Sequence, residues 1–168
     1  MSIAADIARI AEQEKRLVFP AFDEATAFAI GSSIRERGLK EGFPIIVDIR
    51  SWDRPLFYCA LPGSTASNAD WARRKINVVR MFLKSTYRMM LEQGGESALL
   101  GERHGLAVSD YVLAGGGFPV TVKGAGVIGV IAVSGLPQRQ DHEVIVAALC
   151  DHLGIARNEL ALQAGAQE

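Results

Sequence analysis

The chain has 168 residues, of which 49% are hydrophobic and 22% are charged, and its net charge is -1. This length suits one domain with a substantial core rather than two domains. A near-neutral charge gives no basic field to hold a nucleic-acid backbone. The sequence has no apolar run long enough to span a bilayer and no secretion signal at its start. We therefore expect a cytoplasmic protein that binds neither nucleic acid nor membrane.

The domain organisation follows from the absence of internal repeats, low-complexity tracts and flexible linkers in the sequence. We predict a single domain over residues 1–168, with a core at about 21–155, an N-terminal helix at 1–15 and a C-terminal tail at 156–168. The two cysteines, at positions 59 and 150, form no CxxC pair. Such spacing is typical of free thiols in a reducing compartment rather than of a disulfide.

The first part of the chain has helical periodicity. Three isoleucines recur at helical spacing: Ile3, Ile7 and Ile10. They predict an amphipathic helix over residues 3–14. A second helix is predicted from Pro20 to Gly38, because acidic residues in its first turn favour the helix dipole.

The pattern then changes to two short strands, at 44–50 and 55–61, joined by polar turn residues at 51–54. This spacing predicts a hairpin. A long helix follows, with Ser67 or Asn68 as its N-cap. Its packed face carries residues at alternating spacings of four and three: Trp71, Lys75, Val78, Phe82 and Ser85.

A glycine-rich segment at 114–135 predicts a second hairpin, whose strands flank a turn at 123–126. The letters of residues 124–129 match the dinucleotide motif GxGxxG. That motif must open a helix, whereas a short β-branched run follows here. We therefore interpret the turn glycines as positions of positive φ, and Gly129 as a point of close approach to a neighbouring element. A closing helix is predicted from Pro137 to Leu153.

Several blocks occur in an order that resembles the HbpS-like haem-degrading domain family, also called GlcG-like. The blocks are Ile45–Ile49, Leu56–Tyr58, Pro62–Gly63, Ser67–Lys75, Gly115–Val120, Ile128–Gly135 and Asp141. The segment Phe118–Lys123, the run Ser134–Gln138 and the pair Asp141–His142 are most similar to the branch called uncharacterised protein family 0303.

This resemblance implies an α+β fold: a single α-β-α layered domain with a central antiparallel sheet, profilin-like or HbpS-like, that forms a homo-oligomer. Some relatives bind haem or are fused to corrinoid enzymes, whereas the branch has no agreed reaction. Haem is therefore a possible cofactor. The chain departs from many relatives at Leu136 and Pro137, where they have a second glycine, and the family's ligand contacts do not transfer through this turn.

The main candidate site is the turn Ser134–Gly135 before the closing helix. Backbone N–H groups and the helix dipole favour an anionic group there, beside Asp141 and His142. In the alternative interpretation, Asp141 itself supplies the negative charge to these N–H groups and His142 is solvated. Gly116, in the triple glycine, is a further candidate contact.

Lys75 shares a helix face with apolar residues, so its ammonium must find a carboxylate or reach water. The two candidate partners for the ammonium of Lys75 are the carboxylate of Asp48 and an anionic ligand. His104 lies in a predicted loop and is the weak candidate for binding haem iron through a neutral imidazole. In the alternative interpretation it is a surface histidine without a role.

Three functions remain open. The first is the binding of a small anionic ligand such as haem or a related tetrapyrrole, and the second is an enzyme acting on haem. The third is a non-enzymatic interaction or scaffold protein, for which the Ile3, Ile7 and Ile10 stripe would be an exposed contact surface. In the alternative interpretation, the opening helix simply covers its own sheet. The sequence has no recognisable pair of nucleophile and base and no metal-ligand cluster, and the resemblance together with the turn at Ser134–Gly135 places ligand binding ahead of catalysis.

Overall fold

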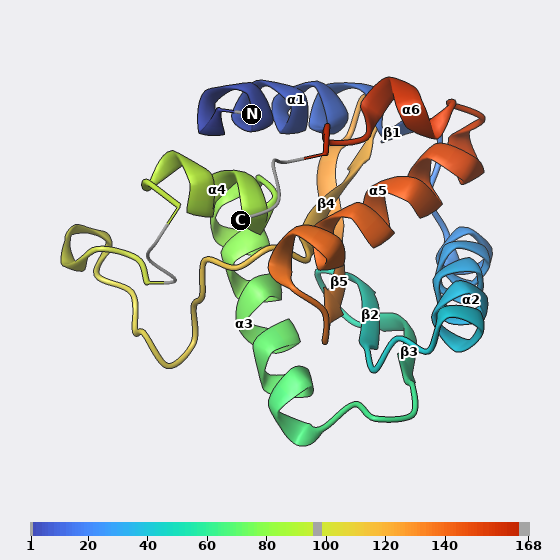
Figure 1. Ribbon diagram of the computed structural model, residues 1–168, viewed down its shortest axis with the longest axis horizontal. Helices are drawn as coiled ribbons and strands as arrows, with labels where there is room; N and C mark the ends of the chain where they lie inside the picture. Colours follow the sequence, from blue (N-terminus) through green and yellow to red (C-terminus); the bar gives the residue numbers. More distant parts are fainter. Residues whose placement is uncertain (1, 96–98, 165–168) are drawn as a thin grey trace.

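A computed structural model describes residues 2–95 and 99–164 (Figure 1). In chain order, its elements are α1 (Ile3–Arg16), β1 (Val18–Phe19), α2 (Glu24–Glu41), β2 (Ile46–Ser51), β3 (Pro55–Ala60), α3 (Ala66–Phe82), α4 (Thr86–Glu92), the 3-10 helix η1 (Glu102–His104), β4 (Gly117–Val122), β5 (Gly126–Ser134), α5 (Gln138–Leu153) and α6 (Arg157–Leu160).

The strands form one five-stranded sheet in the order β1-β4-β5-β2-β3. The pairs β4-β5, β5-β2 and β2-β3 are antiparallel, as the resemblance implied. The two-residue β1 pairs in parallel with β4, so the complete sheet is mixed. Sequence periodicity missed β1 because two residues are too few to produce an alternating pattern.

Helices cover both faces of the sheet, which confirms the α-β-α layers (Figure 1). Neighbouring residues of a strand point to opposite faces. In β5, Val130 and Ala132 accordingly contact the α3 side, whereas Ile131 and Val133 face α2 and α5. The layers therefore bring α3 and the start of α5 to opposite sides of the same end of β5.

The helix α1 packs against α4 rather than on the sheet. Ile10 is completely buried in a cluster with residues of α4, and Ile7 packs partly buried against it. Only Ile3 of the predicted stripe is largely exposed, at 47%. The stripe is thus mostly internal, and the proposal of an exposed contact surface there was wrong.

The packed core extends beyond the 21–155 range predicted from the sequence. Leu17 and Phe19 precede that range, and Leu160 follows it, yet all three are buried in the main hydrophobic cluster. The stretch expected to be a C-terminal tail thus contributes α6 and a core residue. Its composition gave no sign of this, because a single four-residue helix carries too little periodicity.

The glycine hairpin is confirmed. β4 and β5 are antiparallel partners, and the turn between them has Gly124 and Gly126 at φ of +81° and +82°. A Cβ on Gly129 would lie 2.2 Å from the backbone oxygen of Arg50 in the adjacent β2, so this position requires glycine. No helix follows the GxGxxG letters, which excludes the dinucleotide interpretation.

The start of the long helix differs from the prediction. α3 begins at Ala66, after Thr65 as N-cap. Asn68 stabilises this end from within the helix, since its Oδ1 accepts the N–H of Thr65 at 2.8 Å. The helix ends at Phe82, and Ser85 is instead the N-cap of α4, where its hydroxyl accepts the N–H of Arg88.

Both cysteines are free thiols, as predicted. Within residues 2–95 and 99–164, none of the helices combines the length and the apolar character that crossing a bilayer requires.

Candidate functional site

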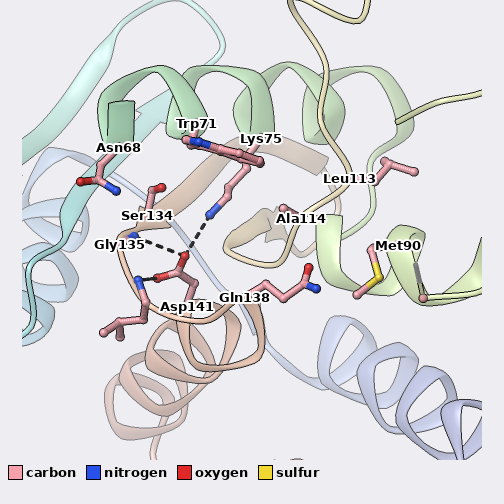
Figure 2. Close-up of a pocket in the computed structure, with 12 residues that line it drawn as sticks. Asn68, Trp71, Lys75, Met90, Leu113, Ala114, Ser134, Gly135, Gln138 and Asp141 are labelled. Carbon is pink, nitrogen blue, oxygen red and sulfur yellow. Dashed lines mark hydrogen bonds and ion pairs between the residues drawn. The ribbon is translucent and has the colours of Figure 1, made fainter. Parts of the chain in front are cut away.

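A cavity of about 380 Å³ lies between α3, α4, the loop before β4, the end of β5 and the start of α5 (Figure 2). Its polar side is formed by Asn68, Lys75, Ser134, Gly135, Gln138 and Asp141. Its apolar side includes Trp71, Met90, Leu113, Ala114 and Leu136. The polar groups around Lys75 and Asp141 form one end of the cavity, the polar end, with Trp71 beside Lys75 and Leu136 beside Asp141. Met90 and Leu113 lie toward α4 (Figure 2).

A buried ion pair forms the floor of the polar end. The Nζ atom of Lys75 donates to Oδ2 of Asp141 at 3.0 Å and to the backbone oxygen of Val133 at 2.9 Å. Only 3% of each charged side chain is exposed. An ammonium group carries three protons, so these two bonds leave one proton for the cavity that Lys75 lines.

Asp141 also binds the turn that precedes its own helix. Its Oδ1 accepts the N–H of Leu136 at 3.0 Å, and its Oδ2 accepts the N–H of Gly135 at 3.4 Å. The turn amides considered as an anion-receiving group therefore contact the protein's own carboxylate. This is the first part of the alternative interpretation, in which Asp141 supplies the negative charge.

Burial changes the acid-base properties of both members of the pair. Burial lowers the pKa of Lys75, and the nearby Asp141 opposes that shift. Burial likewise raises the pKa of Asp141, against the effect of Lys75 and of the two turn amides. Both shifts have the same cause, which is that a dry environment disfavours charged forms. The neutral amine and the neutral acid are thus easier to reach than in water.

Gly116 lies behind the ion pair and has φ of +115°. A Cβ at this position would lie 2.3 Å from the backbone oxygen of Val133, 2.8 Å from Nζ of Lys75 and 2.9 Å from Cβ of Asp141. Gly116 is not among the residues that line the cavity. Its place in the site is therefore structural: it leaves room for the pair.

The proposed pairing of Lys75 with Asp48 was wrong. Asp48 is held by Arg50 on its own strand, with Nε to Oδ1 at 3.0 Å and Nη2 to Oδ2 at 2.7 Å. The α3 helix crosses the sheet so that Lys75 reaches the end of β5, at Val133, instead of the middle of β2. Sequence periodicity gives the helix face but not the strand beneath each turn of the helix.

His142 is completely buried, so the expectation that it is solvated was also wrong. Its Nε2 lies 2.7 Å from Oε1 of Gln13. Its ring packs near those of Tyr87 and Phe118, with centroids 5.4 and 5.7 Å away. Burial lowers the pKa of His142 to about 3, which keeps the imidazole neutral. His142 lies outside the cavity lining and connects α5 to α1.

His104 does not reach the cavity either. It is the last residue of η1, and its ring meets that of Phe82 edge-on at 5.5 Å between centroids. The structure thus brings together four of the sequence candidates around the cavity: Lys75, Ser134, Gly135 and Asp141. Gly116 supports them from behind, and the two histidines lie elsewhere.

Sequence reasoning missed other lining residues, mainly Trp71, Met90, Leu113 and Gln138. Two of them were detectable, because Trp71 precedes Lys75 by four residues and Gln138 precedes Asp141 by three, which places each pair on one helix face. Met90 and Leu113 carried no such signal. They come from α4 and from an irregular loop, and only the tertiary fold brings them to the site.

Residues 22–150 match the family described as "Haem degrading protein HbpS-like". The chain belongs to the HbpS-like family. Within it, the chain is 69% identical over 167 residues to a UPF0303 protein of Mesorhizobium japonicum, covering 99% of this chain and 100% of that one. The resemblance to uncharacterised protein family 0303 is therefore confirmed.

Solved structures show the same fold. The crystal structure of Ybr137w protein superposes with a TM-score of 0.80 at 24% identity, covering 88% of this HbpS-like chain and 87% of the other. The PduOC:Heme complex superposes with a TM-score of 0.62 at 21% identity, over 79% and 94% of the two chains. At these identities the likeness shows the fold alone.

Whether the cavity suits a haem depends on which of its lining side chains could bind the iron. Haem iron is usually held by histidine, thiolate, tyrosine or a methionine paired with histidine. Among the described residues that line the cavity, the only such side chain is Met90, and the nearest amine, Lys75, is engaged with Asp141. The polar end can bind a carboxylate, but the lining does not fit the iron of a haem. The cavity chemistry therefore favours recognition of an acid group.

Proposed function

We propose that the protein binds a small organic anion with an apolar body in the cavity beside Lys75 and Asp141. The observation that carries this proposal is that hydrogen-bond donors and apolar side chains line the same cavity. The third N–H of Lys75 and the hydroxyl of Ser134 supply donors at the polar end. Trp71, beside Lys75, and Met90, toward α4, supply apolar surface (Figure 2). Such a mixture is typical of sites that fix a ligand by one polar group.

The electrostatics of the polar end support an anion. The charge of Asp141 is offset by Lys75 and by two turn amides, so the pair has no excess negative charge. The α5 helix begins beside it, and Pro137 occupies the N-cap position without a side-chain cap. Asp141, in the first turn of α5, already offsets part of the positive end of the helix dipole, so the attraction that remains for a ligand's acid group is worth at most about 0.3–1 kcal/mol.

The size of the cavity limits the ligand. About 380 Å³ lies near the lower end of the range of roughly 300–1,000 Å³ for small-molecule sites. An acid with one aromatic ring is small enough to lie completely within a cavity of this volume. The family description suggests a haem-type tetrapyrrole as a second candidate. Such a ligand would enter by one carboxylate edge, with its iron away from protein donors.

The test is a titration that separates the carboxylate from the iron. Haem, metal-free protoporphyrin and the dimethyl ester of protoporphyrin are added in turn, and the Soret band is followed; 3-phenylpropionate serves as the small acid, followed by calorimetry. We expect the small acid to bind, haem and metal-free porphyrin to bind with similar Kd, and the diester to bind at least tenfold more weakly. Equal binding of the diester, or binding only of the iron form, would contradict the proposal.

Variants connect this binding to the cavity. Lys75→Met combined with Asp141→Leu removes both charges together, because a lone buried charge would destabilise the fold. A charge-assisted hydrogen bond is worth about 1.5–3 kcal/mol, so the double variant is expected to bind the acid roughly tenfold to a hundredfold more weakly. Lys123→Met is the matched control, because Lys123 is an exposed lysine in the hairpin turn.

We also infer that the protein forms a homo-oligomer through the β3 edge of the sheet. Among the described strands, β3 pairs with β2 alone, and it carries Tyr58 with 52% exposure. On the neighbouring α2, Phe28 is 65% exposed. Exposed apolar side chains beside an unpaired strand edge are typical of association surfaces. Light scattering tests this inference. The Tyr58→Lys variant is expected to be monomeric, whereas the control Val108→Lys, at another exposed apolar residue, should keep the assembly. A monomeric wild type contradicts the inference.

A further inference from the structure

The amine of Lys75 combines two properties that are rarely found together in a lysine. The residue is only 2% exposed, yet it lines a cavity that a small molecule can occupy (Figure 2). By contrast, Lys123 in the hairpin turn is exposed to water. A buried lysine that only stabilises a fold needs a partner but no neighbouring space. The space beside Nζ therefore needs an explanation of its own.

A lysine acts as a nucleophile only as the free amine, so it needs a group that accepts its proton. The Oδ2 atom of Asp141 lies 3.0 Å from Nζ, within direct proton-transfer distance. The carbonyl of Val133 holds the amine from another direction at 2.9 Å, which fixes its position. The pair therefore provides both the nucleophile and its proton acceptor at the wall of the cavity.

We propose that Lys75 condenses with the carbonyl group of a bound aldehyde or 2-oxo acid to form an imine. The apolar lining residues select a carbonyl compound with an aromatic or branched apolar body, and the polar end receives the acid group of a 2-oxo acid. This inference rests on the proposed function, since the carbonyl compound must occupy the same cavity as the organic anion.

The reaction balances with the groups present. The ammonium of Lys75 first gives a proton to the carboxylate of Asp141. The free amine then attacks the carbonyl carbon, and a C–N bond forms while the C–O π bond opens. Proton transfer from nitrogen to oxygen gives a carbinolamine. Protonation of its hydroxyl by the acid form of Asp141 allows water to leave as the C=N bond forms. Asp141 is then again a carboxylate, and the net change is ammonium plus carbonyl to protonated imine plus water, without oxidant or reductant.

The environment supports the first step. Burial lowers the pKa of Lys75 and raises the pKa of Asp141, so both shifts reduce the free energy needed to move the proton from one to the other. Gly116 leaves the room that the amine occupies beside Asp141, since any Cβ there would lie 2.8 Å from Nζ.

The test traps the imine by reduction. The wild-type protein is incubated with phenylpyruvate, sodium borohydride is added, and the adduct is located by peptide mass spectrometry. Binding of 3-phenylpropionate, which has the same ring and acid group but no ketone, is measured in parallel by calorimetry. We expect a single main adduct at Lys75 that forms at least tenfold faster than any adduct at Lys123. Excess 3-phenylpropionate should suppress it.

The outcomes distinguish the two proposals. If 3-phenylpropionate binds but Lys75 is labelled no faster than Lys123, the imine inference is overturned and the binding function stands. If neither binding nor labelling is found, both fail. The Lys75→Met and Asp141→Leu double variant, checked for folding by circular dichroism, is expected to lose the main adduct, whereas Lys123→Met keeps it. Retention of the main adduct in the double variant would also overturn the inference.

Discussion

The ammonium of Lys75 and the carboxylate of Asp141 lie 3.0 Å apart with only 3% of either side chain exposed. The first residue comes from α3 on one face of the sheet and the second from α5 on the other. Their contact crosses the end of β5, where the carbonyl of Val133 also accepts from Lys75. The pair thus joins both helical layers at the cavity, and changes to it affect stability and binding together.

Removing one charge of this pair is expected to be far more harmful than removing both. Asp141→Leu leaves the ammonium of Lys75 buried without a counter-ion, which should lower the free energy of unfolding by about 3–5 kcal/mol. Adding Lys75→Met should restore most of that loss, because matched apolar replacements of buried pairs are often nearly neutral. Urea denaturation of the single and double variants measures this. Equal losses in the two proteins would show that the pair is not coupled.

Gly116→Ala is expected to destabilise the protein by at least about 3 kcal/mol, through an unfavourable φ and a clash with the oxygen of Val133. Gly124→Ala is the matched control. It also has positive φ, at +81°, but open space around its Cβ. Its cost should therefore be only the backbone strain, roughly 1–2 kcal/mol. Denaturation of both variants separates the steric effect from the conformational one.

Most of the strand pairing in the sheet was predictable from the sequence, whereas the side-chain contacts between helices on its two faces were not. The glycine hairpin of β4 and β5 and the β2-β3 hairpin were recognisable because turn residues and alternating runs are local signals. The partner of Lys75 was not, since the choice between Asp48 and Asp141 depends on how α3 crosses the sheet. Helix crossing is set by tertiary packing, which the spacing of residues along one helix does not specify.

The same reason explains the errors at His142 and at the N-terminus. His142 follows the first turn of a helix, a place that is often exposed. It is buried because α1 and the residues after α5 pack over it, with Gln13 between Nε2 of His142 and the backbone oxygen of Leu160. These contacts join positions more than 125 residues apart in sequence. No local pattern could predict them.

His142 should make stability dependent on pH below about 6.5. Its pKa is about 3 in the folded protein and 6.5 in the reference state, so the unfolded chain binds the additional proton between these values. Stability is therefore lost as the pH falls through 6.5 toward 3, by about 1.4 kcal/mol per pH unit from this residue. His142→Gln should lack this contribution. Denaturation of both proteins at pH 7 and pH 5 gives the difference in slope, and parallel slopes would contradict it.

Trp71 is expected to contribute to ligand binding more than to stability. Its ring lines the cavity and is only partly buried, with the guanidinium of Arg74 stacked 4.5 Å from its centroid. Trp71→Leu should weaken binding of an aromatic acid by up to about tenfold, because aromatic contacts are worth about 0.5–1.5 kcal/mol beyond area burial. Met81→Leu, on the same helix but outside the cavity, is the control. Calorimetry that finds equal Kd for both variants would remove Trp71 from the site.

The most direct measurement of the central claim is a backbone amide NMR titration of the wild-type protein with 3-phenylpropionate. We expect the amide signals of Gly135, Leu136 and Gln138, at the turn and the start of α5, to shift most strongly, while those around Arg37 and Lys40 on the far helix α2 stay in place. Shifts concentrated at α2, or no saturable shift at all, would contradict the assignment of the Lys75 and Asp141 cavity as the ligand site.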